Sequence, residues 1–482
     1  MLVAGVVVAA PAGAVDGDVV WARQLGGTDY DSGYGVAVDG SGNVYATGYF
    51  KGTADFDPGT GTFVLISAGD SDGFVSKLDA HGGLVWARQL GGTGSDYGEG
   101  VAVDGSGNVY VTGYFTGTAD FDPGLGTLEM ASSAGSDDVF VWKLDAAGNL
   151  VWARRLGGTS SDYGLGVAVD GSGNVYVTGS FQGTADFDPG AGTSNLTSTG
   201  SSDVFVEKLD AAGNLVWARR LGGTGSDGGE GVAVDGSGNV HTTGYFNGTA
   251  DFDPSVGTID LISAGSFDVF VSKLNAAGNF VWARRLGGTG SDDGRGGVAV
   301  DGLGNVYVTG DFFGTADFDP GAGTLNLAST GAADVFVEKL DAAGLLVWAR
   351  RLGGTGFDDG NGVAVDGSGN VYVTGDFSGT ADFDPGTGTL EMASSAGSYD
   401  GFVEKLDAAG LLVWARQLGG TGSDYGLGVV VDGWGIVYAT GYFSGTADFD
   451  PGAGTFNLTS AVSDDVFVSK LDAAGTLVWA RQ

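Results

Sequence analysis

The sequence predicts an all-β fold: a seven-bladed β-propeller whose blades are four-stranded antiparallel sheets of about 65 residues each. The first observation is an internal repeat, because Val-Trp-Ala-Arg recurs eight times at intervals of 65 or 66 residues. The second is that each interval holds four short strand-like runs and no helical pattern. The repeated tryptophans are Trp21, Trp86, Trp152, Trp217, Trp282, Trp348, Trp414 and Trp479.

One unit shows the predicted strands in chain order. Residues 100–104 and 108–115 are β-branched and aromatic runs joined by Gly-Ser-Gly, which indicates a first hairpin. Residues 138–144 and 150–154 flank the turn at residues 145–149, whose Asp and Gly suit side-chain capping and a positive φ. The alternative is a linear β-solenoid, although its coils are usually shorter. Independent sandwiches would require each short unit to bury its own core.

Aromatic residues occupy fixed places in the repeat. A phenylalanine ends the second strand of every copy, whereas the residue before it varies among Tyr, Ser and Asp. Strand alternation therefore places the phenylalanine in the core and its neighbour toward water. The repeated tryptophan is interpreted as packing between neighbouring blades. The phenylalanines are Phe50, Phe115, Phe181, Phe246, Phe312, Phe377 and Phe443.

The predicted domain organisation is a leader followed by one propeller. Residues 1–14 are an apolar run ending in Ala-Gly-Ala, which is typical of the end of a signal peptide, although no basic residue precedes Arg23. Residues 15–482 form one domain, and its extra N-terminal strand at residues 19–25 duplicates the strand that ends the chain. We expect this N-terminal copy to be displaced or to take the closing place. The approximate units are residues 26–90, 91–156, 157–221, 222–286, 287–352, 353–418 and 419–482.

The composition excludes several classes of protein. The chain has 21 Lys and Arg against 59 Asp and Glu, a net charge of −38, which disfavours binding to nucleic acid or to an anionic membrane surface. Without cysteine, a disulfide scaffold and a thiolate metal site are excluded. No apolar stretch reaches the length of a membrane span. We expect a monomeric propeller.

The order of motifs resembles a known repeat family. Leu-Gly-Gly-Thr-Gly-x-Asp precedes Gly-Val-Ala-Val-Asp-Gly-x-Gly-Asn-Val-Tyr-Val-Thr-Gly, and Asp-Phe-x-Pro and Val-Phe-Val-x-Lys-Leu-Asp-x-x-Gly follow. This order is similar to the bacterial SBBP-type β-propeller repeat, over residues 19–482. The resemblance implies a secreted or cell-surface bacterial protein. It supplies no common catalytic residues.

Acidic loops between the second and third strands carry the candidate chemistry. Each contains Asp-Phe-Asp-Pro, and in extended chain its two carboxylates share one side and could bracket a calcium ion, with other oxygens completing the shell. The alternative is that these aspartates cap turn amides and keep the surface soluble. We expect the seven loops to form a ring on one side of the propeller. The predicted calcium ligands are Asp55, Asp57, Asp120, Asp122, Asp186, Asp188, Asp251, Asp253, Asp317, Asp319, Asp382, Asp384, Asp448 and Asp450.

The basic residues are as regular as the acidic ones. A lysine follows Phe-Val-x in each unit, and an arginine ends each Val-Trp-Ala-Arg. With so many carboxylates nearby, we expect both to pair with aspartate, although exposed pairs contribute only about 0–1 kcal/mol each.

No catalytic residue is predicted, because residues that break the repeat are few. His81, His241, Trp142, Arg295 and Trp434 are isolated substitutions and are interpreted as drift. The predicted function is a non-enzymatic exported or cell-surface scaffold that binds a surface polymer, glycan or protein through many similar loops. The alternatives are a secreted polysaccharide-active hydrolase or lyase, and a purely structural array within a larger surface protein.

Overall fold

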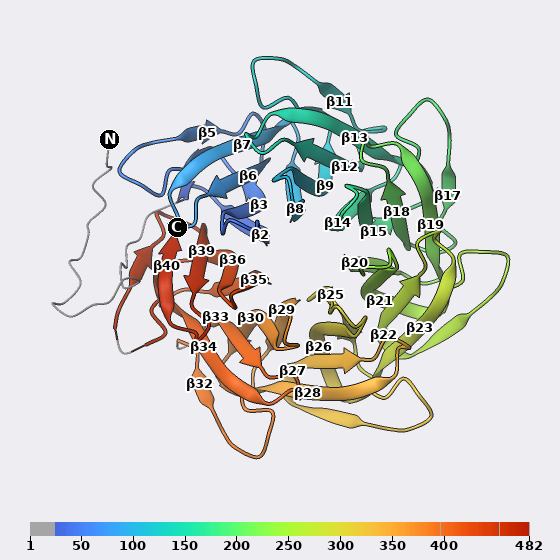
Figure 1. The fold of residues 1–482 in the computed structure, drawn as a ribbon, viewed down its shortest axis with the longest axis vertical. Helices are drawn as coiled ribbons and strands as arrows, with labels where there is room; N and C mark the ends of the chain where they lie inside the picture. The colour runs from blue at the N-terminus through green and yellow to red at the C-terminus, as the bar shows by residue number, and fades with distance from the viewer. Residues whose placement is uncertain (1–24, 396, 453, 482) are drawn as a thin grey trace.

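The computed structural model describes residues 25–395, 397–452 and 454–481. These residues form β-strands and turns without a helix, so none of the described chain is a helix that could cross a membrane. The ladders between strands are antiparallel. Figure 1 shows the strands arranged radially around a common axis, as a repeat of small sheets requires.

Four strand positions recur from the axis outward. Nearest the axis lie β2 (Asp31–Val38), β8 (Asp96–Val103), β14 (Asp162–Val169), β20 (Gly228–Val234), β24 (Asp292–Asp293) with β25 (Val298–Val300), β29 (Asp358–Val365) and β35 (Asp424–Val431). Next are β3 (Val44–Phe50), β9 (Val109–Thr116), β15 (Val175–Phe181), β21 (Val240–Asp251), β26 (Val306–Asp317), β30 (Val371–Ser378) and β36 (Val437–Phe443). The third are β6 (Asp72–Leu78), β12 (Asp137–Leu144), β18 (Asp203–Leu209), β22 (Asp260–Leu274), β27 (Asn326–Leu340), β33 (Tyr399–Leu406) and β39 (Asp465–Leu471). The fourth are β7 (Leu84–Gly92), β13 (Leu150–Gly158), β19 (Leu215–Gly223), β23 (Phe280–Gly288), β28 (Leu346–Gly354), β34 (Leu412–Gly420) and β40 (Leu477–Arg481).

The two predicted hairpins of each unit are present. In the second unit β8 pairs with β9, β9 with β12, and β12 with β13. Phe115, at the end of the second strand, is fully buried, which confirms its predicted place in the core. Its ring packs edge-on against Phe121, with 5.3 Å between the ring centroids.

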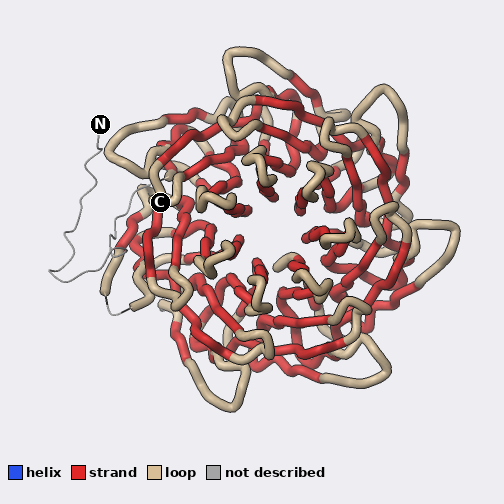
Figure 2. The backbone as a smooth tube through the Cα atoms, viewed as in Figure 1, coloured by secondary structure: helices blue, strands red, loops and turns tan. Residues whose placement is uncertain are grey.

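The acidic loops form a further hairpin at the outer edge of the ring, which we call the rim hairpin. It pairs with the fourth strand of the preceding unit, as where β10 bonds to β7 through Gly92↔Ala119. The loops therefore project outward around the circumference (Figure 2). The separate rim strands are β4 (Thr53–Asp55), β5 (Val64–Ile66), β10 (Thr118–Asp120), β11 (Glu129–Ala131), β16 (Thr184–Asp186), β17 (Asn195–Thr197), β31 (Thr380–Asp382), β32 (Glu391–Ala393), β37 (Thr446–Asp448) and β38 (Asn457–Thr459), and in two units the long strands β21, β22, β26 and β27 include them.

This pairing explains the repeated Leu-Gly-Gly. A Cβ atom on Gly92 would lie 1.8 Å from the carbonyl oxygen of Thr118 on the rim hairpin. Only glycine lets the two backbones approach so closely. We infer that the Leu-Gly-Gly motif is a docking point for the next unit.

Hydrophobic clusters lie between neighbouring units. One cluster brings Tyr45 and Trp86 of the first unit against Val109 and Phe115 of the second. The indole N–H of Trp86 donates to the carbonyl oxygen of Ala146 in the next unit at 3.2 Å. The inter-blade role of the repeated tryptophan is thus seen directly, and each unit depends on its neighbours for a core.

In the six described copies from Arg88 to Arg416, the repeated arginine forms no ion pair with aspartate, contrary to expectation. Arg88 donates from Nε to the carbonyl oxygen of Gly148 in the next unit at 2.7 Å, and its guanidinium lies over the Trp86 ring at 5.4 Å. The backbone carbonyl groups of this turn face the arginine and have no partner strand. The N–H groups of the guanidinium donate hydrogen bonds to them instead. It is the following residue that forms ion pairs, as where Arg155 contacts Asp138 at 2.7 Å.

Both ends of the described chain pair with the same strand, β39. β40 pairs with it where Trp479 lies opposite Lys470. Leu25 bridges to Val466 in the place that Leu90 takes opposite Gly73 in the first unit. β1 (Gly26–Gly27) then pairs with β4, as β7 pairs with β10. Residues 1–24, which include the run predicted to be a leader and most of the duplicated sequence, lie outside the described residues.

Candidate functional site

The two aspartates of each acidic loop hold the turn of the rim hairpin. Asp120 Oδ1 accepts the backbone N–H groups of Asp122, at 3.0 Å, and Leu128, at 2.8 Å. Asp122 Oδ1 accepts the N–H of Gly124 at 2.8 Å. Phe121, between the two, is fully buried. The alternation predicted for Asp-Phe-Asp is confirmed, and turn capping, the alternative role, is observed.

The same hydrogen bonds recur in the other six copies. In each, the first aspartate accepts two amides and the second accepts one. These pairs are Asp55 with Asp57, Asp186 with Asp188, Asp251 with Asp253, Asp317 with Asp319, Asp382 with Asp384, and Asp448 with Asp450.

The donor set is small for calcium, which takes about six to eight oxygens. Among the described residues, no group of three or more Asp, Glu or His side chains converges as a metal site would. Since one oxygen of each aspartate already accepts amide protons, the pairs alone do not fit a calcium shell.

Calcium dependence has a simple thermal test. If the hydrogen bonds of the aspartates fully explain the acidic loops, the melting temperature in calcium will equal that in excess chelator. A rise of several degrees in calcium, absent with magnesium, would show that the loops bind the ion.

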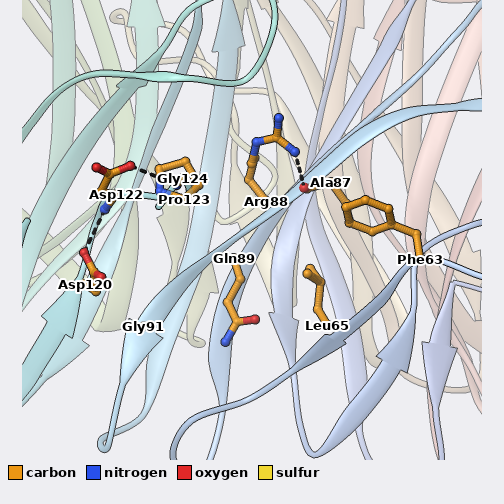
Figure 3. A pocket seen from close by; sticks show the side chains of 10 residues that line it. All are labelled: Phe63, Leu65, Ala87, Arg88, Gln89, Gly91, Asp120, Asp122, Pro123 and Gly124. Atoms are coloured by element: carbon orange, nitrogen blue, oxygen red, sulfur yellow. Dashed lines mark hydrogen bonds between the residues drawn. The ribbon is translucent and has the colours of Figure 1, made fainter. Parts of the chain in front are cut away.

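The aspartate pairs also line grooves between neighbouring rim hairpins. In Figure 3 the groove of about 300 Å³ runs across β7, from Phe63 and Leu65 on one side to Asp120 and Asp122 on the other. An equivalent groove crosses β13, with Asp186 opposite the β11 strand, and another crosses β19, with Asp251 opposite β17. We call these the rim grooves.

The rim grooves offer several kinds of contact together. One wall has carboxylate oxygens, and the floor has arginine or glutamine, such as Gln89 or the one-third exposed Arg155. The opposite wall has apolar side chains such as Leu65 and Met130. Acceptors, donors and an apolar edge in one open groove suit a ligand with hydroxyl or amide groups.

The two histidines are not part of these grooves. His241 replaces a tyrosine and is buried, with Nε2 3.5 Å from Asp235, in the place where Tyr45 donates to Asp39. Burial lowers the pKa of His241 to about 4, and the charge of Lys273 adds to this effect. A structural role in place of tyrosine explains this residue.

Sequence reasoning missed a second group of residues, around the axis. The first and second strands of each unit face each other at one register position, and together these pairs form what we call the axial collar. The pairs are Ser32↔Tyr49, Tyr97↔Tyr114, Tyr163↔Ser180, Gly228↔Tyr245, Asp293↔Asp311, Asp359↔Asp376 and Tyr425↔Tyr442.

The axial collar corrects two expectations. The residue before each repeated phenylalanine was expected to face water, but Asp311 and Asp376 are only 7% and 2% exposed. Arg295 was interpreted as drift, but its Nε donates to Asp293 at 2.7 Å. The sequence did carry a signal, because the aspartates that replace tyrosine, serine or glycine at the paired collar positions occur in the same two units. Recognising it required the register between strands.

Fold, grooves and collar together define an all-β repeat protein. Six segments of the chain match the SBBP beta-propeller repeat, at residues 20–52, 85–122, 151–183, 216–253, 281–311 and 347–379. The resemblance predicted from the motifs is thus confirmed for these segments.

Two curated relatives are similar over parts of their length. An uncharacterized WD repeat-containing protein of Acanthamoeba polyphaga mimivirus is 25% identical over 511 residues, which cover 89% of this chain and 36% of the relative. The regulatory protein FlaEY of Caulobacter vibrioides is 31% identical over 200 residues, which cover 42% of this chain and 20% of the relative. The chain thus matches about a third and a fifth of these proteins.

Solved structures show only distant similarity. A protein of unknown function from Bacteroides caccae has a TM-score of 0.34 at 10% identity, covering 71% of this chain and 94% of that one. A europium-containing methanol dehydrogenase has a TM-score of 0.37 at 12% identity, covering 85% and 72%. Similarity at this level does not inform the function.

Proposed function

We propose that the chain is a seven-bladed β-propeller with four-stranded blades, and that it acts as a non-enzymatic binding scaffold exported to the surface of a bacterial cell. The observation that carries this proposal is the recurrence of one groove, with the same aspartate pair, between neighbouring units. Similar sites at regular spacing favour a ligand that itself repeats. The partner proposed is therefore a surface polymer, such as a polysaccharide.

The regularity of the grooves also favours binding over catalysis. A glycosidase needs one carboxyl group that is protonated and one that is ionised, so the environments of the two must differ from the rest. Here every aspartate pair accepts the same amide protons, as Asp120 and Asp186 illustrate. Export is proposed from the apolar run at residues 1–14, which lies outside the described residues.

The test is a binding screen against polysaccharides and cell-wall polymers. The variant Asp122→Asn/Asp188→Asn/Asp253→Asn alters three rim grooves but keeps an oxygen that can accept the turn amide. We expect it to bind a polymer recovered in the screen at least tenfold more weakly than the wild type.

Asp70→Asn is the matched control, because the Asp70 side chain is 63% exposed and lines none of the grooves described. It should bind like the wild type. Equal loss in the control and the triple variant would show a general effect of charge and overturn the assignment to the grooves. Release of shorter fragments from a bound polymer would favour the hydrolase or lyase.

A further inference from the structure

The axial collar has an acidic sector in two adjacent units. Asp293 lies directly opposite Asp311 across one pair of strands, and Asp359 lies opposite Asp376 across the next. The strands β26 and β29 of these two units contact each other. Like charges placed directly opposite each other destabilise a sheet, so these two facing pairs of carboxylates lower the stability of the fold when they are ionised.

One arginine is shared among the acidic sector. Arg295 donates to Asp293, and its positive charge also acts on Asp311 and Asp359. Its side chain is 61% exposed, so it does not seal the sector from solvent. Four carboxyl groups share this one guanidinium, so ionisation of all four would leave a local excess of negative charge.

Asp311 is only 7% exposed, and Asp293 opposite it has a buried oxygen, Oδ1, with no hydrogen-bond partner among the described residues. Phe312, the next residue on β26, is fully buried in the core, so Asp311 points to the opposite side, toward Asp293 and Arg295. Burial raises its pKa well above the ordinary value, and the charges of Asp359 and Asp293 add to the effect. A carboxylate in this position is stabilised by an additional cation.

The rest of the collar is largely aromatic. Tyr49 packs on Tyr97 with 4.8 Å between ring centroids, Tyr97 on Tyr114 with 4.9 Å, and Tyr114 on Tyr163 with 4.8 Å. On the other side of the collar Tyr425 packs on Tyr442 with 4.7 Å between ring centroids, and Tyr399, just outside the collar, packs on Tyr425 with 5.5 Å. These tyrosines are partly exposed, so their rings are accessible.

Tyrosines lie near the acidic sector on both of its sides. Besides burial, the charge of Asp376 raises the pKa of both Tyr399 and Tyr425. On the other side, burial raises the pKa of Tyr245 to about 12, and the charges of Glu230 and Asp293 contribute. Aromatic faces and carboxylates therefore meet around one axis.

We propose that the axial collar binds an organic cation of the alkylammonium class, with its ammonium groups on the acidic sector and its alkyl part against the tyrosines. Tyrosine rings attract cations through their negative faces, and the carboxylates supply the opposite charge. The net charge of −38 concentrates cations near the protein and steers them to the site. This site lies apart from the rim grooves and does not depend on their function.

The proposal is tested by isothermal titration of the full chain with 1,4-diaminobutane, and with 1,4-butanediol as its uncharged counterpart. We expect the diamine to bind and the diol not to bind. Asp311→Asn/Asp359→Asn should weaken diamine binding at least tenfold, whereas Asp70→Asn should leave it unchanged. Tyr425→Leu should weaken it several-fold, because it removes an aromatic face next to Asp376.

The variant Arg295→Gln distinguishes cation binding from a structural role of the acidic sector, because a structural role predicts no change in diamine affinity. Because the guanidinium competes for the same carboxylates, its removal should strengthen diamine binding. Equal binding of diamine and diol, or equal diamine affinity in wild type and Asp311→Asn/Asp359→Asn with normal circular dichroism, would overturn the proposal. Binding of calcium ions at the collar in preference to the diamine would also overturn it.

Discussion

Deletion of residues 477–482 is expected to open the ring and lower the free energy of unfolding by about 5 kcal/mol or more. The deletion removes β40, and with it the buried Trp479 and the fully buried Arg481. Trp479 donates to Ala80 at 3.3 Å and Arg481 donates to Gly82 at 3.0 Å, so their loss separates the last unit from the first. Truncating a single buried aromatic side chain already costs about 3–5 kcal/mol. Thermal unfolding by circular dichroism measures the effect.

Milder variants keep this prediction testable if the shortened chain does not fold. Trp479→Phe loses the indole hydrogen bond but keeps an aromatic ring, and should lower the melting temperature by a few degrees. The control is Val462→Ala, because Val462 is in the same unit and 76% exposed. If the deletion melts at the wild-type temperature, the pairing of β40 with β39 contributes nothing to stability and our description of its role is wrong.

Replacing three buried glutamates by glutamine is expected to stabilise the protein above neutral pH. Glu207, Glu338 and Glu404 occupy the same position of the third strand, and all are fully buried. In the described chain neither carboxylate oxygen of any of the three has a hydrogen-bond partner. Burial raises the pKa of each well above the ordinary value of 4.5, and nearby aspartates raise it further.

The sign of the pH dependence follows from these raised pKa values. Above pH 4.5 the glutamates ionise in the unfolded chain but stay protonated in the folded one, so the stability that they contribute falls as the pH rises. Glutamine does not ionise, and its amide can donate as Trp142 does to the Phe121 carbonyl oxygen from this position at 2.9 Å. We expect a gain of about 2 kcal/mol per site at pH 8 and little change at pH 4.

Melting temperatures of the wild type and the triple variant Glu207→Gln/Glu338→Gln/Glu404→Gln across this pH range check the result. Glu129→Gln is the control, since Glu129 is an exposed residue of the rim strand β11. It should change the melting temperature by less than a degree at either pH. A triple variant no more stable than the wild type at pH 8 would show that the glutamates have polar partners when the protein folds.

Much of the fold could be predicted because the repeat is long and its apolar positions are regular. The strands around Phe115 and the two hairpins of each unit followed from alternation and turn residues. The rim hairpin could not be foreseen, because strands such as Thr118–Asp120 have only three residues, too few for alternation to distinguish a strand from an extended loop. Their pairing depends on the close approach that Gly92 permits to another unit.

The candidate sites divide in the same way. Asp120 and Asp122 were found because their motif recurs, and the structure places them in a groove. The axial collar was missed because Asp293 and Asp311 are 18 positions apart in the sequence and meet only through strand register. Arg88 was misjudged because sequence shows nearby carboxylates but not the backbone carbonyl of Gly148 in another unit.

The most direct test of the scaffold function is how affinity depends on ligand length. Fragments of increasing length, prepared from a polymer that the screen recovers, would be titrated against the full chain by isothermal calorimetry. If neighbouring rim grooves act together, the dissociation constant should fall at least tenfold once a fragment reaches two grooves, and Asp122→Asn/Asp188→Asn/Asp253→Asn should abolish that step. A dissociation constant that is the same for the shortest fragment and the whole polymer, or a step that survives in the triple variant, would contradict multivalent binding through the rim.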